Sequence, residues 1–320
     1  MPDEKSSIDV SIAGFRKGIW KSKLLEQADA EGMSQELGER HFATFIDRSS
    51  TLIVTFETQQ GIRAMSETQQ PFGFELVKAQ DWSHLCIISD GDTWFRDAKV
   101  YGFFDRLIDD GFFEDFDHVV FYGAGPCGYA ASAFSVASPG ATVVAIQPQA
   151  TLDPRMTEWD DRFTDMRRVS FTDRYGYAPD MLDAADRAFV LYDPTQALDA
   201  MHATLFKRPN VTRLRMRHMG GELQSRLLDM NLLYRLLTLA GTQKLNAHAF
   251  YRLYRARRAY PRYLKSIVGH LDREGRPYLN MLLCRNVLSR MPMRRLRRKL
   301  EELEQKAKDG AFTPPPPPAE

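Results

Sequence analysis

The stretch YGAGPCGYAASAF, from Tyr122 to Phe134, follows the apolar run 119–121 and continues into a segment of small residues. An apolar run, a glycine-rich turn and a small-residue helix are the parts of a strand–turn–helix unit in a parallel sheet. The turn contains the spacing G-x-G-x-x-G, formed by Gly123, Gly125 and Gly128. This spacing occurs in dinucleotide-binding turns, and a sharp turn of similar shape also presents the nucleophile of hydrolases.

Further apolar runs place this unit inside a larger sheet. Five runs rich in β-branched and aromatic residues have the length of buried strands, and a sixth alternates as an edge strand would. They cover residues 52–56, 85–88, 118–122, 142–146, 188–192 and 211–216. Helical patterns fall between most of them, at residues 100–110, 128–138 and 197–208. This alternation predicts an α/β fold, with a doubly wound, mostly parallel sheet covered by helices on both faces.

The composition is that of an ordinary globular protein, with 43% hydrophobic and 27% charged residues in a chain of 320. No apolar run approaches the roughly 20 residues of a membrane-spanning helix, and the polar start of the chain lacks the apolar core of a signal peptide. We therefore expect a cytoplasmic protein that is not transmembrane. The cysteines Cys86, Cys127 and Cys284 are far apart and form no zinc-type cluster, so we expect reduced thiols, no metal and no cofactor.

Charge divides the chain into regions. Residues 249–320 hold 17 Lys and Arg against 7 Asp and Glu, a net charge of +10, while the rest of the chain is net −9. We expect an N-terminal segment, an α/β domain, a C-terminal basic helical extension and a disordered proline-rich tail, covering residues 1–40, 41–245, 246–310 and 311–320. The extension either contacts a polyanion or packs on the body up to about Leu288, with residues 293–308 exposed.

Around the glycine turn the chain resembles the α/β-hydrolase superfamily. The resemblance is to a branch whose turn reads Y-G-S-S-M-G-G-Y-x-A, followed by a strand and P-Q-x-x-x-D-P. In this chain the corresponding stretches are YGAGPCGYAA, which starts at Tyr122, and PQATLDP, which starts at Pro148. The resemblance spans roughly residues 50–240. It implies a nucleophile elbow that includes Gly123, Gly128 and Tyr129, with Gly125 at the position of the serine nucleophile.

The same resemblance implies an acid and a histidine further along the chain, in that order. Asp193 stands directly after the run 188–192, and His218 follows the run 211–216. Both positions lie at strand ends, where an open α/β sheet presents its reactive groups. The alternatives are a turn or capping role for Asp193 beside Pro194 and an ordinary loop histidine at His218.

The nucleophile position is where the chain departs from the family pattern. Gly125 has no side chain, so a covalent Ser–His–Asp mechanism is not available to it. Cys127 comes two residues later, at the start of the expected helix, where a helix N-terminus lowers the pKa of a thiol and activates it. The alternative for Cys127 is a buried structural cysteine.

These features favour a degenerate hydrolase-like protein that serves as a binding or structural protein for a small molecule or protein partner. Chemistry in which His218 acts as a general base stays open, and so does the question of whether the protein is an enzyme. One alternative is a dinucleotide-binding oxidoreductase that uses Gly123, Gly125 and Gly128, although no acidic residue stands at the end of the following strand to bind the ribose. Another is a sulfonucleotide (phosphoadenosine phosphosulfate) reductase, from the loop Ser89–Thr93. Residues 159–163 form either a lid over the pocket or a surface turn.

Overall fold

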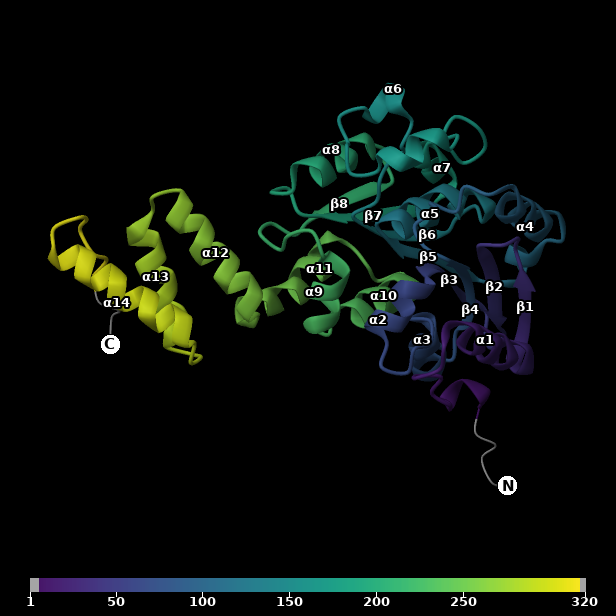
Figure 1. Cartoon of the computed structure of the whole chain (residues 1–320), viewed down its shortest axis with the longest axis horizontal. Helices are drawn as coiled ribbons and strands as arrows, with labels where there is room; N and C mark the ends of the chain where they lie inside the picture. Colours follow the sequence, from purple (N-terminus) through teal and green to yellow (C-terminus); the bar gives the residue numbers. More distant parts are fainter. Residues whose placement is uncertain (1–5, 317–320) are drawn as a thin grey trace. The chain divides into compact units, whose positions relative to one another are not determined.

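The computed structural model describes residues 6–316, and the chain forms two compact units, Met1–Tyr251 and Arg252–Glu320. The first unit is built on an eight-stranded sheet in the order β1-β2-β4-β3-β5-β6-β7-β8 (Figure 1). Strand β2 is antiparallel to both of its neighbours, and all other neighbouring pairs are parallel. The strands are β1 (Gly32–Glu36), β2 (His41–Ile46), β3 (Thr51–Thr58), β4 (Ser83–Ser89), β5 (His118–Ala124), β6 (Thr142–Ile146), β7 (Arg187–Tyr192) and β8 (Val211–Arg215).

The predicted fold class is therefore confirmed. All six runs that were expected to be strands are strands, from β3 to β8. The sequence analysis missed β1 and β2. Strand β1 is polar and lies at the sheet edge, where it bonds only to β2, so its composition carries little β signal. Residues 1–40 are consequently not a separate segment, because α1 (Lys17–Glu31) and β1 belong to the same unit as the sheet.

Two apolar clusters, one on each face, hold helices against the sheet. Side chains alternate along each strand, so Leu85 and Ile87 pack with one cluster while Cys86 and Ile88 pack with the other. The first cluster includes residues of α4 (Ala98–Asp109), α5 (Pro126–Phe134), α7 (Ala178–Met181) and α8 (Ala197–Leu205). The second includes residues of α1, α2 (Gln59–Met65) and α3 (Gly73–Gln80).

Shorter elements complete the first unit. Helix α10 (Leu233–Gly241) contacts β3, β5 and β6. The remaining α-helices of this region are α6 (Pro154–Thr157), α9 (Leu223–Asp229) and α11 (Ala247–Leu253). The 3-10 helices of the first unit are η1 (Ser7–Asp9), η2 (Phe112–Asp115), η3 (Ser135–Ala137), η4 (Thr164–Arg168) and η5 (Leu182–Ala184), while η6 (Tyr254–Ala259) belongs to the second unit.

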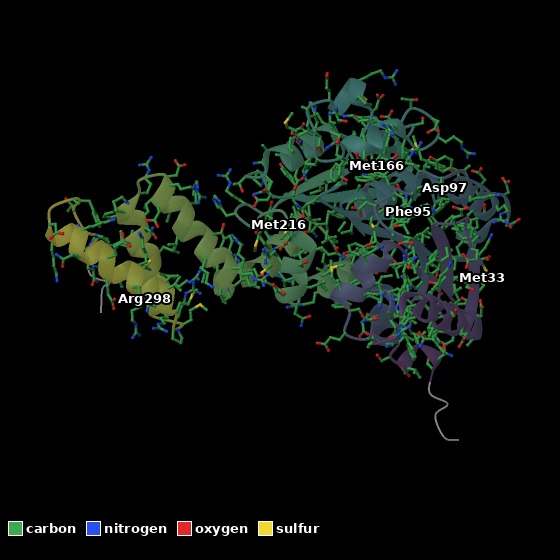
Figure 2. The ribbon with its side chains drawn as sticks, viewed as in Figure 1. Met33, Phe95, Asp97, Met166, Met216 and Arg298 are labelled. Atoms are coloured by element: carbon green, nitrogen blue, oxygen red, sulfur yellow. The ribbon has the colours of Figure 1, made fainter. Side chains whose placement is uncertain are left out.

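The second unit has a small core of its own, formed by α12 (Pro261–Arg273), α13 (Pro277–Leu288) and α14 (Arg294–Lys308). The expectation that residues 293–308 are exposed is wrong, because Leu296 is 1% exposed and Leu303 is 2% exposed. Figure 2 labels Arg298, which is exposed on α14. Net charge alone does not reveal the apolar stripe of α14, because the segment contains many charged residues such as Arg298. Packing of these helices on the first unit stays a prediction.

The end of the chain was expected to be disordered from residue 311. Residues 313–316 have no regular secondary structure, although Arg285 Nη1 donates to the carbonyl oxygen of Pro315 at 2.9 Å. The last four residues, 317–320, lie outside the described part of the chain. In residues 6–316, no helix has the length and apolar character needed to cross a membrane.

The separate core makes Leu296→Ala a test of the two-unit division. We expect this change to destabilise the second unit by about 2–4 kcal/mol, since it deletes a fully buried leucine side chain. Amides of α13 and α14 should then exchange faster with solvent, while amides of β5 and β6 should not change. Leu279→Ala is the control, because Leu279 is 48% exposed on α13. Equal loss of protection in the sheet would contradict the division.

Candidate functional site

The predicted elbow is a sharp turn between β5 and α5. Gly125 lies at its apex with φ +57° and ψ −125°, and Pro126 begins the helix. Glycine reaches this positive φ without the strain that other residues pay there. The Gly125 N–H donates to the carbonyl of Ile146 at 2.8 Å, which ties the turn to the end of β6. A Cβ atom built on Gly125 would meet no heavy atom within 4 Å, so the apex faces open space.

The other two glycines are explained by close packing of the strand and the helix. A Cβ atom on Gly123 would lie 2.1 Å from the carbonyl oxygen of Cys127. A Cβ atom on Gly128 would lie 3.1 Å from the carbonyl oxygens of Gly123 and Ile146. Helix–strand packing therefore accounts for the G-x-G-x-x-G spacing without a bound pyrophosphate. The dinucleotide-binding alternative gains no support from these glycines.

Asp193 and His218 lie at the same edge of the sheet as Gly125, after the carboxyl ends of β7 and β8. The Asp193 side chain is fully buried. Its carboxylate accepts the backbone N–H of His218 at 3.1 Å and that of Gly220 at 2.7 Å. It also accepts the backbone N–H and the hydroxyl of Thr195, at 2.8 and 2.7 Å. The two bonds from His218 and Gly220 fasten the loop after β8 to the end of β7, and the two from Thr195 fix the turn that contains Asp193.

Cys127 lies in the first turn of α5 and is 7% exposed. Burial, with a further contribution from the Glu57 carboxyl, raises the pKa of the Cys127 thiol well above its usual value. A nucleophilic cysteine needs the opposite shift, because the thiolate is the reactive form. The environment of Cys127 thus favours the structural interpretation of this residue over the catalytic one.

Tyr129 was grouped with the elbow, and it is a core residue. Its ring is fully buried, and its hydroxyl donates to the carbonyl of Tyr175 at 2.6 Å. Burial raises the pKa of this hydroxyl strongly. Tyr129 therefore anchors the segment around residue 175 to α5 and is not exposed to a ligand at the turn.

A pocket of about 350 Å³ opens beside Gly125. This volume falls at the lower end of the range for small-molecule sites. Its polar lining includes four side-chain amides, one guanidinium and two carboxylates, belonging to Gln147, Gln149, Gln196, Gln224, Arg162, Asp199 and Glu222. Arg162 and Phe163 belong to the segment 159–163, so its interpretation as a wall of the pocket is supported over that of a plain surface turn.

A buried polar network that the sequence analysis missed supports this wall. Arg162 Nη1 donates to Asp199 Oδ1 at 2.6 Å, and its Nη2 donates to Asp160 Oδ2 at 2.8 Å. His202 Nε2 lies 2.9 Å from the same Asp160 oxygen, while the Ala150 N–H donates to His202 Nδ1. Burial alone would raise the pKa of Asp160, but the hydrogen bonds from His202 and Arg162 outweigh it and hold the pKa well below its usual range. The network fixes the position of Arg162.

The loop Ser89–Thr93 is engaged with its own chain. The Ser89 hydroxyl donates to the carbonyl of Gly91, and the Gly91 N–H donates to Gln60 Oε1 at 3.0 Å. Asp90 forms an ion pair with Lys17 at 2.6 Å. The groups that would cradle a phosphate are thus used in a capped turn. The sulfonucleotide reductase alternative is not supported.

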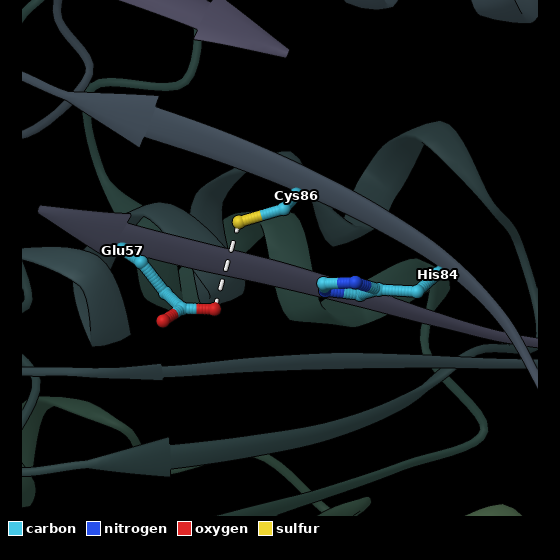
Figure 3. A group of neighbouring side chains, drawn as sticks. All are labelled: Glu57, His84 and Cys86. Carbon is cyan, nitrogen blue, oxygen red and sulfur yellow. Dashed lines mark hydrogen bonds between the residues drawn. The ribbon is translucent and has the colours of Figure 1, made fainter. Parts of the chain in front are cut away.

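A second, smaller pocket of about 130 Å³ is lined by Glu57 and Cys127, among others. Glu57 stands near the end of β3, and behind it lie His84 and Cys86 of β4, with all three side chains buried (Figure 3). Burial raises the pKa of the Glu57 carboxyl and of the Cys86 thiol, and it lowers the pKa of His84 to about 3. Among the described residues, these three are the group whose side-chain chemistry suits a metal ion.

The sequence matches no protein-family model and no curated protein. Several solved structures are similar to the chain. EstE1, a thermophilic carboxylesterase cloned from a metagenomic library, is 14% identical over 72% of this chain and 97% of its own, with a TM-score of 0.41. Est1E from Butyrivibrio proteoclasticus is 10% identical over 66% of this chain and 99% of its own, with a TM-score of 0.41. An esterase from Pyrobaculum calidifontis is 13% identical over 76% and 94%, with a TM-score of 0.40.

The α/β-hydrolase-like fold predicted from the elbow motif is confirmed. It is visible in the chain's own mostly parallel sheet, in the helices on both faces, and in the sharp turn between β5 and α5. At these TM-scores the similarity to the esterases is coarse, and the esterase activity belongs to those proteins and is not transferred to this chain.

Proposed function

We propose that this chain is a hydrolase-like scaffold without a nucleophile, which binds a small polar molecule in the pocket beside Gly125. The observation that carries the proposal is the apex itself. The residue there has no side chain, and it adjoins a pocket large enough for a small ligand. The cysteine nearest the apex is buried with a raised pKa, so it does not replace the missing group.

The lining of the pocket favours a neutral polar ligand over an anion. Arg162 is the cation in the lining, and it is already bonded to the carboxylates of Asp160 and Asp199. The amides of Gln147 and Gln149 already bond within the chain, to Asp199, Leu223 and Trp94 among others. The amides of Gln196 and Gln224 offer donors and acceptors that suit hydroxyl or amide groups on a ligand. Asp193 supports this binding role, since its bonds to the main chain of residues 218 and 220 hold the neighbouring loop in place.

The enzymatic side of the proposal is tested with a generic ester such as nitrophenyl acetate. We expect wild type and Cys127→Ala to hydrolyse it no faster than buffer does, because neither provides an activated nucleophile to form an acyl intermediate. Circular dichroism confirms that both proteins are folded. A clear wild-type rate that Cys127→Ala abolishes would make Cys127 the nucleophile and would contradict the proposal.

The binding side is tested by thermal denaturation with matched panels of neutral polyols, amides and small carboxylates. A ligand at 100 times its Kd stabilises the folded state by about 2.7 kcal/mol, which is readily measured as a rise in Tm. Gly125→Leu is the control, because its side chain would project into the pocket. Stabilisation by the neutral compounds, lost in Gly125→Leu, is expected. Stabilisation that survives Gly125→Leu would place the ligand elsewhere.

A further inference from the structure

Glu57, His84 and Cys86 come together because two neighbouring strands present them on the same face. Strands β3 and β4 are parallel, with Thr55 opposite Cys86. Glu57 is two residues beyond Thr55, and His84 is two residues before Cys86, so all four side chains point to the same side of the sheet. Figure 3 shows the three potential ligands converging, with a hydrogen bond drawn between Cys86 and Glu57. One donor atom from each lies within 4.8 Å of the other two.

These atoms are a carboxylate oxygen, an imidazole nitrogen and a thiol sulfur, which together form a ligand set that Zn²⁺ accepts. In a tetrahedral site with metal–ligand bonds of about 2.0–2.3 Å, neighbouring ligand atoms lie about 3.3–3.7 Å apart. Cys86 Sγ and Glu57 Oε1 are 3.5 Å apart, which already fits this spacing. The imidazole nitrogen lies within 4.8 Å of both atoms, so it has to approach by no more than about 1.5 Å to reach this spacing.

The Glu57 carboxylate accepts the Phe72 N–H at 3.1 and 3.0 Å and the Thr55 hydroxyl at 2.9 Å, but no cation among the described residues is paired with it. Glu57 is 8% exposed and forms no ion pair with a Lys or Arg among the described residues 6–316. A buried charge is ordinarily paired or bound to a metal. His84 Nε2 lies 2.8 Å from Thr55 Oγ1, while its Nδ1 is buried without a hydrogen-bond partner. A dication bound to a carboxylate, a thiolate and a neutral imidazole would leave this region with no net charge.

We propose that Glu57, His84 and Cys86 form a binding site for a divalent metal ion of the zinc class. Thr55 stands beside the ligands, and its hydroxyl donates to Glu57 Oε1 at 2.9 Å, so it orients the carboxylate. Glu57 lines the small pocket of the first unit, which provides the route by which an ion enters. The small pocket shares Ala124, Pro126 and Gln224 with the Gly125 pocket, but none of the three proposed ligands lines the Gly125 pocket, so the inference does not depend on the function proposed for it.

The test uses Co²⁺, which replaces Zn²⁺ and reports its ligands by absorption. The full-length protein is stripped with a chelator and titrated with Co²⁺, then with Zn²⁺ as competitor. We expect one equivalent of Co²⁺ to bind, with a thiolate-to-cobalt charge-transfer band that Zn²⁺ removes. Cys86→Ser should abolish this band. Cys284→Ser is the matched control, because Cys284 is an equally buried thiol in the second unit.

A second pair of variants keeps the proposal open to refutation if Cys86→Ser does not fold. Glu57→Gln preserves the shape of the side chain and should weaken metal binding at least tenfold, while Cys127→Ser should leave both the affinity and the band unchanged. Absence of metal binding by the folded wild type would overturn the proposal. A band that persists in Cys86→Ser, or that disappears in Cys127→Ser, would overturn it as well.

Discussion

Gly123→Ala is expected to destabilise the first unit by about 4 kcal/mol or more, a loss at the upper end of single-substitution effects. The new Cβ atom would lie 2.1 Å from the carbonyl oxygen of Cys127 and 2.8 Å from the amide nitrogen of Gly128. Both are backbone atoms, so the strand and the helix have to separate to admit it. For a domain of this size, the change corresponds to a fall in Tm of about 8 °C or more.

Gly125→Ala is the matched control, two residues away in the same turn. Its Cβ atom meets nothing within 4 Å, so the only cost is backbone strain at φ +57°. Strain of this kind costs about 1–3 kcal/mol. Urea denaturation of the two variants measures the difference directly. Equal destabilisation by both substitutions would contradict the geometry described for the turn.

Asp193→Asn is expected to cost about 3 kcal/mol and to loosen the loop at residues 218–220. The carboxylate accepts four hydrogen bonds. In asparagine one oxygen is replaced by an NH₂ group, so a donor would face some of these donors and their bonds would be lost. The amides of His218 and Gly220 should therefore exchange faster with solvent. Denaturant unfolding and hydrogen exchange measure the two effects on the same protein.

Asp186→Asn serves as the control for this prediction. Asp186 is an exposed carboxylate next to the other end of β7, paired with Arg187, and its loss should cost less than about 0.5 kcal/mol. If Asp193→Asn leaves stability and the exchange of both amides unchanged, the carboxylate is not the anchor of this loop.

The sheet was predictable because its central strands are continuous apolar runs, which can be recognised in the sequence without knowing how the side chains pack. The edge strand β1 was not predictable, because its residues carry little β signal and it forms a strand by pairing with β2. The sharp turn at Gly125 was predictable because the glycine, its small neighbours and the preceding apolar run are visible in the sequence, whereas its φ of +57° is known only from the structure. The burial of α14 was missed because Leu296 and Leu303 sit among many charged residues.

The metal-type cluster lay beyond sequence reasoning for a different reason. Glu57 is separated from His84 by 26 intervening residues, and their approach depends on the register of β3 against β4. The network of Asp160 and His202 likewise depends on how one loop packs against α8. Periodicity and motif spacing report local structure, so they do not contain the distance between side chains on different elements.

The open space at the elbow apex has an evolutionary consequence. The serine codons AGU and AGC differ from the glycine codons GGU and GGC at a single base, so the two residues are neighbours in the genetic code. A Cβ atom at position 125 would meet no heavy atom within 4 Å, and the backbone already forms the sharp turn. From either of those two glycine codons, a change to serine at this position therefore needs one base substitution and no rebuilding of the scaffold, at a cost of about 1–3 kcal/mol of backbone strain.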